Sequence, residues 1–283
     1  SYGADNPDGR FSTDRMLHFA IEIHRRLDPE HQDKQLGFLV YGYQIELPKT
    51  AQPGPGVTGT ICYMDWDYDH TRPMNDPTSP SNRKFLRLIK GWGKLLPMMG
   101  YYDYPTDYVH FAPYGQVAKL REDIPLVHDL GVTCMVIEGQ PILATNALNL
   151  YICSRLQYDV NEDVDVLVEE FIHKFYGPAA EPMRKYWLAA EYYTATLRPG
   201  PRAQDRMTRI PAMWEELDDC LKEAETLVAN LPENQKRFRD RIAFQRDGFE
   251  LARQKCAIRD LVYTRQKAVK PGALTAENRQ RAE

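Results

Sequence analysis

The sequence predicts an α/β protein in which the C-terminal half of a (β/α)8-type barrel, with four parallel strands, precedes an all-helical region. Short apolar runs alternate with amphipathic segments of helical period up to about residue 160, which is typical of parallel strands joined by helical crossovers. Beyond that point only the helical period remains. We therefore expect residues 1–160 to hold the βα units and residues 161–283 to form the helical region.

The predicted strands are short apolar runs that end at polar or turn-forming residues. They cover residues 36–43, 57–64, 98–104 and 132–138. A helix capped by Ser12 or Thr13 precedes the first strand, and helices with one apolar face are expected at residues 81–96, 114–130 and 142–156. The link between the first two strands is rich in proline and glycine, so we expect an extended loop over residues 44–56.

The C-terminal region opens with a clear amphipathic helix. Its apolar stripe is Val164, Leu167, Val168, Phe171, Ile172 and Phe175. Gly177 and Pro178 then mark the end of this helix and the start of the next. Further helices are expected near residues 180–197, 205–230 and 233–268. Such helices either buttress a barrel or form a dimer surface, so a homodimer through this region is one of the expected assemblies.

Composition excludes several classes of partner. The 283 residues carry a formal net charge of −4, which gives no electrostatic reason to expect nucleic acid or an anionic membrane surface. No stretch reaches the roughly 18 apolar residues of a membrane span.

The five cysteines lie far apart without a C-x-x-C pair, which favours buried free thiols. The acids of residues 65–70 lack the glycine and the final glutamate of a calcium loop, and no nucleotide-binding motif is present, so neither metal nor cofactor is expected.

Carboxylates and aromatic rings gather where the four predicted strands end. In a parallel barrel this edge carries the chemistry, because the βα loops meet there. The residues concerned are Tyr41, Tyr43, Asp65, Trp66, Asp67, Tyr102, Asp103, Tyr104, His110 and Glu138. Aromatic rings stack on the faces of pyranose rings, and carboxylates accept hydrogen bonds from sugar hydroxyls or act as acid, base or nucleophile. This combination predicts a carbohydrate pocket.

Three of these carboxylates are the candidate catalytic residues: Glu138, Asp103 and Asp65. Glu138 ends an apolar run, where a charge is unfavourable unless a partner compensates it. It either faces the ligand, pairs with a nearby arginine or caps the next helix. Adjacent strands lie about 4.8 Å apart, so we expect Glu138 and Asp103 to share one water or one sugar hydroxyl. The other seven residues are candidates for substrate binding, with core aromatics and a plain loop histidine as the alternatives.

Several segments resemble a known bacterial family. They are "KQLGFLVYGYQIELPK", "SPSNRKFLRLIKGWGKL", "GYYDY", "VIEG" and "VDVLVEEFIHKFYGPAAEPMRKY". Together they are similar to the domain-of-unknown-function 4838 family over roughly residues 10–195. The resemblance implies a (β/α)-barrel related to α-glucuronidases and hexosaminidases, and a periplasmic or secreted location. It also implies that the chain starts after the fourth barrel strand, which would place the general acid in the other half of the barrel.

Three functions remain open at this point. The leading one is a glycoside hydrolase, or a fragment of one, that acts on a polysaccharide or oligosaccharide by carboxylate acid/base chemistry. The second is a non-catalytic barrel that binds carbohydrate. The third is an unrelated α/β enzyme with an open sheet, for which the acidic strand ends would be accidental. Release of reducing sugar, compared with binding alone, separates the first two, and the number of strands separates the third.

Overall fold

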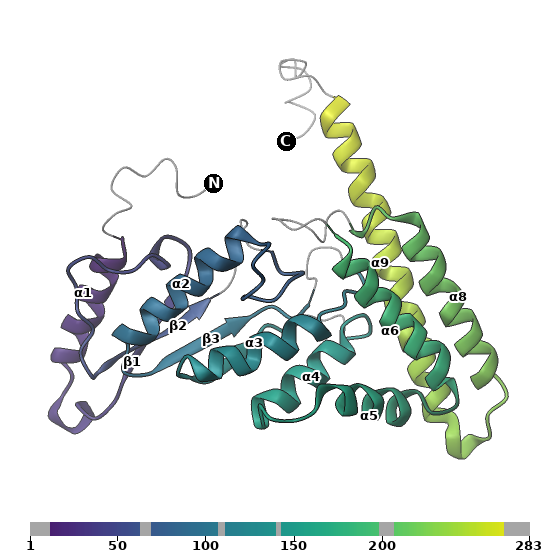
Figure 1. The fold of residues 1–283 in the computed structure, drawn as a ribbon, viewed down its shortest axis with the longest axis horizontal. Coiled ribbons are helices and arrows are strands. Elements are labelled where there is room, and N and C mark those ends of the chain that lie inside the picture. The colour runs from purple at the N-terminus through teal and green to yellow at the C-terminus, as the bar shows by residue number, and fades with distance from the viewer. Residues whose placement is uncertain (1–11, 63–68, 107–110, 140–142, 198–206, 269–283) are drawn as a thin grey trace.

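The computed structural model describes residues 12–62, 69–106, 111–139, 143–197 and 207–268 (Figure 1). Its sheet has four parallel strands in the order of the chain. They are β1 (Leu36–Val40), β2 (Val57–Cys62), β3 (Met99–Asp103) and β4 (Val132–Ile137). Each lies within the range that its apolar run predicts, which confirms the α/β half-barrel topology.

Helices alternate with these strands and then take over the chain. In the strand region they are α1 (Ser12–Arg25), α2 (Pro80–Leu95) and α3 (Val117–Asp129). The helical region contains α4 (Ala147–Tyr158), α5 (Val164–Tyr176), α6 (Ala180–Ala195), α8 (Pro211–Val228) and α9 (Lys236–Ala268). The residues at the start of α2 explain why the helix begins there. Ser79 accepts a hydrogen bond from the backbone N–H of Asn82, and Pro80 occupies the first turn.

One face of the sheet is covered by helices. Ile61 of β2 and Tyr101 of β3 are fully buried. They pack in one apolar cluster with Phe85 and Trp92 of α2 and Val127 of α3. In Figure 1, α2 and α3 lie on the same face of the sheet. Crossovers that all lie on one face, with strands in chain order, are the winding of a barrel and not of a doubly wound sheet.

The opposite face is much less covered in the described part of the chain. Leu39, Tyr41 and Val136 on this face have exposed fractions of 52%, 40% and 41%. We call it the open face and define it by Leu39, Tyr41, Tyr102 and Val136. Parallel sheets in globular proteins generally bury both faces, so these exposed side chains are typical of the inner surface of a half-barrel.

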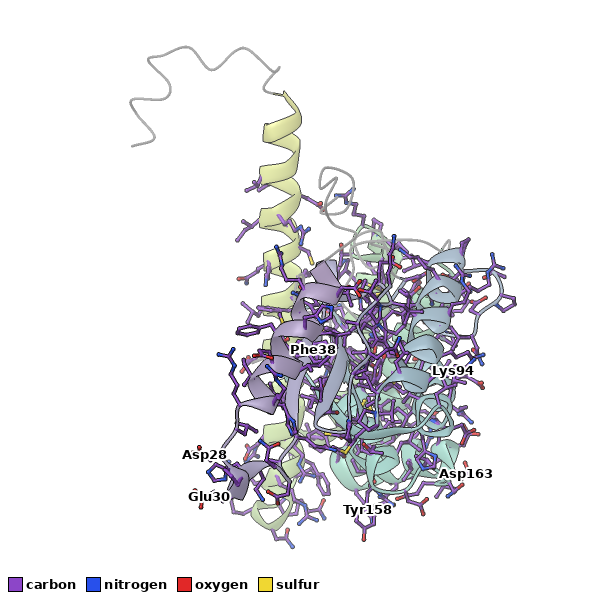
Figure 2. The ribbon with its side chains drawn as sticks, turned by 90° about the vertical axis from the view of Figure 1, so that its left-hand side faces the viewer. Asp28, Glu30, Phe38, Lys94, Tyr158 and Asp163 are labelled. Carbon is purple, nitrogen blue, oxygen red and sulfur yellow. The ribbon has the colours of Figure 1, made fainter. Side chains whose placement is uncertain are left out.

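The described core divides into two apolar clusters. One cluster contains side chains of the sheet and of α1, α2 and α3. The other contains side chains of α4, α5, α6, α8 and α9, together with residues from α3. Figure 2 shows the last turns of α9 projecting beyond the rest of the described chain. Among the described helices, none is long and apolar enough to cross a membrane. Four cysteines are buried as free thiols, and Cys134 is exposed.

The extended loop between β1 and β2 is held by one carboxylate of α1. Asp14 is buried and accepts backbone hydrogen bonds from three consecutive loop residues, Lys49, Thr50 and Ala51. The hydroxyl of Thr50 donates a further bond at 2.9 Å. Burial alone would raise the pKa of Asp14, but these hydrogen bonds outweigh it and hold that pKa well below its ordinary value.

Substitution of Asp14 by alanine is therefore expected to lower the free energy of unfolding by about 2–3 kcal/mol, because several buried donors lose one acceptor together. Chemical denaturation at neutral pH measures this difference. The matched control is Asp33→Ala, which removes an exposed carboxylate paired with Lys34 and should change stability by less than about 0.5 kcal/mol. Equal losses in the two variants would contradict this account of the loop.

Candidate functional site

A hydrogen-bonded pair of side chains lies at the C-terminal edge of the open face. Tyr102 of β3 donates its hydroxyl to Oε2 of Glu138 at 3.0 Å. Glu138 follows β4 directly, and its backbone N–H donates to the carbonyl of Asp103 at 3.0 Å, which extends the ladder between the two strands. Both side chains are partly exposed. The carboxylate is thus fixed at the edge where a barrel places its chemistry.

Further groups surround Tyr102 on the same side of the sheet. The rings of Tyr102 and Tyr104 have centroids 5.2 Å apart. The Tyr104 hydroxyl lies 3.2 Å from the Sγ atom of Cys62, the last residue of β2, and the ring of His70 meets Tyr104 edge-on at 6.3 Å. The candidate site therefore combines the carboxylate that follows β4 with the rings of Tyr102 and Tyr104 at the end of β3, and with Cys62 and His70 from β2 and the segment after it.

The tyrosines of this row remain protonated at neutral pH. Burial raises the pKa of Tyr102, and the hydrogen bond to the Glu138 carboxylate raises it further. Burial and the Cys62 thiol likewise raise the pKa of Tyr104. Because a neutral phenol keeps its O–H donor, Tyr102 remains able to orient the carboxylate over the whole physiological range.

Asp103 does not take part in this group, although the sequence suggested that it would. It is fully buried on the helix-covered face, where its Oδ2 lies 3.0 Å from Nζ of Lys119. The reason is a bulge in β4: Met99 pairs with Val132, but Gly100 pairs with Cys134. The extra residue shifts the register by one, so Asp103 pairs with Ile137, and Glu138 points to the other face.

Lys119 joins two buried carboxylates. Its Nζ lies 3.0 Å from Asp103 and 3.0 Å from Asp123, one helical turn further along α3. Asp123 also accepts the backbone N–H of Met74 at 2.6 Å. Burial would raise the pKa of Asp103, yet the charge of Lys119 holds it below its ordinary value. For Asp123 burial dominates and raises the pKa to about 6.

The shifted pKa of Asp123 predicts a pH dependence of stability. Between about pH 4 and pH 6 the folded protein retains a proton that the unfolded chain has released, so the free energy of unfolding should fall as pH rises through this window. At about 1.4 kcal/mol for each pKa unit, the loss is on the order of 2–3 kcal/mol. In Asp123→Asn this loss should disappear, and denaturation curves at several pH values compare the two proteins. Parallel pH profiles would contradict the assignment.

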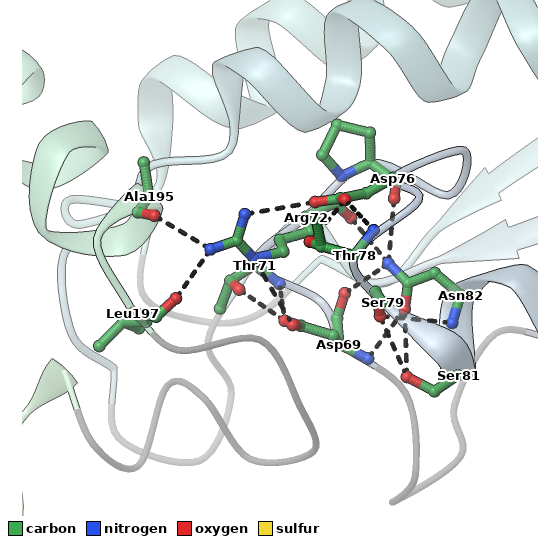
Figure 3. Close-up of polar contacts among 11 residues, drawn as sticks. Asp69, Thr71, Arg72, Asp76, Thr78, Ser79, Ser81, Asn82, Ala195 and Leu197 are labelled. Carbon is green, nitrogen blue, oxygen red and sulfur yellow. Dashed lines mark hydrogen bonds and ion pairs between the residues drawn. The ribbon is translucent and has the colours of Figure 1, made fainter.

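The loop after β2 is fastened at its described end, as Figure 3 shows. Asn82 of α2 donates to the carbonyls of Asp69, Arg72 and Pro73. The Arg72 side chain reaches the helical region. It donates to the carbonyl of Ala195, the last residue of α6, and to the carbonyl of Leu197 just after the helix. The last carbonyls of a helix lack N–H donors from a following turn, so an arginine at this position stabilises the helix end.

The remaining predicted site residues have mixed outcomes. Tyr41 lies on the open face at the end of β1. The candidates Asp65, Trp66, Asp67 and His110 fall outside the described residues, as does the side chain of Tyr43. Cys62 is a neighbour of Tyr104 that the sequence did not single out. His70, which the sequence places in the acidic segment after the second strand as an expected loop residue, meets the Tyr104 ring. Among the described residues, no cluster of three or more His, Cys, Asp or Glu side chains could hold a metal ion.

Comparison with known proteins identifies the family. A family model described as "Domain of unknown function (DUF4838)" matches residues 3–189. This match covers well over half of the sequence, so the chain belongs to that family. No curated protein matches the chain, and no solved structure does.

Proposed function

We propose that this protein is carbohydrate-active and that its ligand binds at the C-terminal edge of the open face. The observation that carries the proposal is the pair of Glu138 and Tyr102, 3.0 Å apart on a partly exposed strand end with further aromatic rings beside it. A fixed carboxylate accepts hydrogen bonds from sugar hydroxyls, and aromatic faces stack on pyranose rings. The family match adds no activity of its own.

In the catalytic form of this proposal the protein is a glycoside hydrolase. Glu138, oriented by the Tyr102 hydroxyl, would act as a base on water or stabilise positive charge at the anomeric carbon. A second carboxylate is needed to protonate the leaving oxygen. Asp103 does not supply it, because it is buried with Lys119 on the other face. Asp65 and Asp67, which follow β2, remain the candidates within this chain.

One observation favours the non-catalytic alternative. Of the described residues at the four strand ends, Glu138 is the only carboxylate on the open face, because Asp103 points to the helix-covered face. A single carboxylate with aromatic rings is sufficient to bind a sugar, whereas hydrolysis generally requires two. The two forms of the proposal therefore differ only in whether a second acid completes the site.

The experiment is a glycan panel tested with the full-length protein. Release of reducing sugar and binding are both measured on cellohexaose, xylohexaose, mannohexaose and chitohexaose, for the wild type and for Glu138→Gln. Turnover that the substitution abolishes supports the hydrolase, and binding without turnover, weakened by the substitution, supports the binding protein. Wild-type protein that neither binds nor cleaves any of these glycans, or a Glu138→Gln variant that behaves like wild type, would refute the proposal.

A further inference from the structure

Asn149, in the first turns of α4, holds both ends of the loop between β3 and α3. Its Nδ2 donates to the carbonyl oxygens of Pro105 at 3.3 Å and Tyr114 at 2.7 Å. Its Oδ1 accepts the backbone N–H of Gln116 at 3.2 Å. The side chain is fully buried, and all three bonds go to main-chain atoms. A buried amide placed in this way sets the path of the loop more than it contributes to the apolar core.

Thr145 holds the same loop near its middle. Its hydroxyl donates to the carbonyl of Phe111 at 2.8 Å. Phe111 has φ of 64°, in the left-handed region that a bulky residue adopts only when its surroundings impose it. The ammonium group of Lys255 in α9 lies 3.1 Å above the centre of the Phe111 ring and adds a second contact. Strain of this kind is commonly retained at functional sites.

The hydrogen bonds of Asn149 and Thr145 to this loop affect the candidate site through neighbouring residues. Pro105 directly follows Tyr104, whose ring contacts Tyr102, the donor to Glu138. Thr145 lies in the segment that continues from Glu138 into α4. Side chains from one short stretch of chain therefore hold Pro105, Phe111, Tyr114 and Gln116, four described residues between β3 and α3.

We propose that Asn149 and Thr145 are positioning residues, which hold Tyr104 against Tyr102 and so fix the orientation of the Glu138 carboxylate. They act through the main chain of the loop, to which the Asn149 amide and the Thr145 hydroxyl are hydrogen-bonded. The effect on sugar binding rests on the function proposed above, whereas the effect on the Tyr102–Glu138 hydrogen bond does not.

The first measurement follows this hydrogen bond in the full-length protein. Tyrosine labelled with carbon-13 at Cζ gives one resonance for each ring, and Tyr102→Phe assigns the relevant one by its loss. In Asn149→Leu the Tyr102 resonance should move toward that of an unbonded tyrosine. Thr145→Val removes one hydrogen bond at nearly constant volume and should move this resonance less, in the same direction. It keeps the test possible if Asn149→Leu does not fold.

The matched control is Gln245→Leu in α9. Gln245 is also a buried amide, and it accepts the hydroxyl of Tyr176 at 3.0 Å within the helical core. Its replacement should lower stability by a similar amount but leave the Tyr102 resonance in place. A purely structural role for Asn149 and Thr145 predicts no difference between the three variants at that resonance.

The second measurement is affinity for the hexasaccharide of the panel that the wild type binds. Asn149→Leu should bind it at least tenfold more weakly, and Gln245→Leu should match the wild type. An unchanged Tyr102 resonance in folded Asn149→Leu and Thr145→Val would overturn the inference, and so would a moved resonance with unchanged affinity. If the wild type binds no sugar, the proposed function fails, and the resonance alone decides whether these residues position Tyr102.

Discussion

Replacement of Lys119 by methionine is expected to lower the free energy of unfolding by about 3–5 kcal/mol at pH 7. Lys119 is buried between Asp103 and Asp123, with 3.0 Å to each carboxylate. Methionine fills a similar volume but leaves two carboxylates inside the protein without a cation. Their desolvation is then no longer compensated, and this uncompensated charge, more than the lost attraction, causes the destabilisation.

Two further variants test this explanation. Lys84→Met removes an exposed ion pair with Glu46 and should change stability by less than about 1 kcal/mol. Lys119→Met combined with Asp103→Asn should recover part of the loss, because only one buried carboxylate then remains. Denaturant titrations of the four proteins give the comparison. A single variant Lys119→Met as stable as Lys84→Met, or a double variant less stable than the single, would contradict the buried-charge account.

Most of the fold could be predicted because it depends on periodic patterns. The apolar face of residues 81–96 predicts a helix, and α2 runs from Pro80 to Leu95. The strand at residues 132–138 is likewise found as Val132–Ile137. Local hydrophobic spacing determines both features, so a single sequence is sufficient. The division of the chain at residue 160 stays a prediction.

The site was less predictable because it depends on which face of the sheet each strand end points to. Glu138 and Asp103 both end apolar runs, and the sequence gives them the same description. The bulge in β4, where Thr133 is the extra residue opposite the step from Met99 to Gly100, puts them on different faces. Apolar spacing gives no sign of this extra residue. The ion pair of Lys119 is weakly indicated in the sequence. A lysine within an apolar stripe and four residues before Asp123 is a pattern that indicates a buried ion pair.

Glu138→Gln is expected to have the largest effect on activity. If the protein hydrolyses a glycan of the panel, kcat should fall several hundred-fold while the fold remains intact, because the neutral amide can neither accept a proton nor stabilise positive charge. The matched control is Glu46→Gln, which neutralises an exposed carboxylate paired with Lys84 and should leave kcat unchanged. Near-normal turnover in Glu138→Gln would place the pocket elsewhere.

Tyr102→Phe supplies the second half of the same prediction. The variant loses one hydrogen bond to Glu138 and keeps the aromatic ring, so kcat should fall about tenfold, the amount expected for one such bond. Tyr102 acts only through Glu138, and the double variant should therefore be no slower than Glu138→Gln alone. Additive losses would instead show that Tyr102 contacts the substrate independently. In a protein that binds without turnover, the same cycle applies to Kd, because the tyrosine then matters only while it orients a carboxylate.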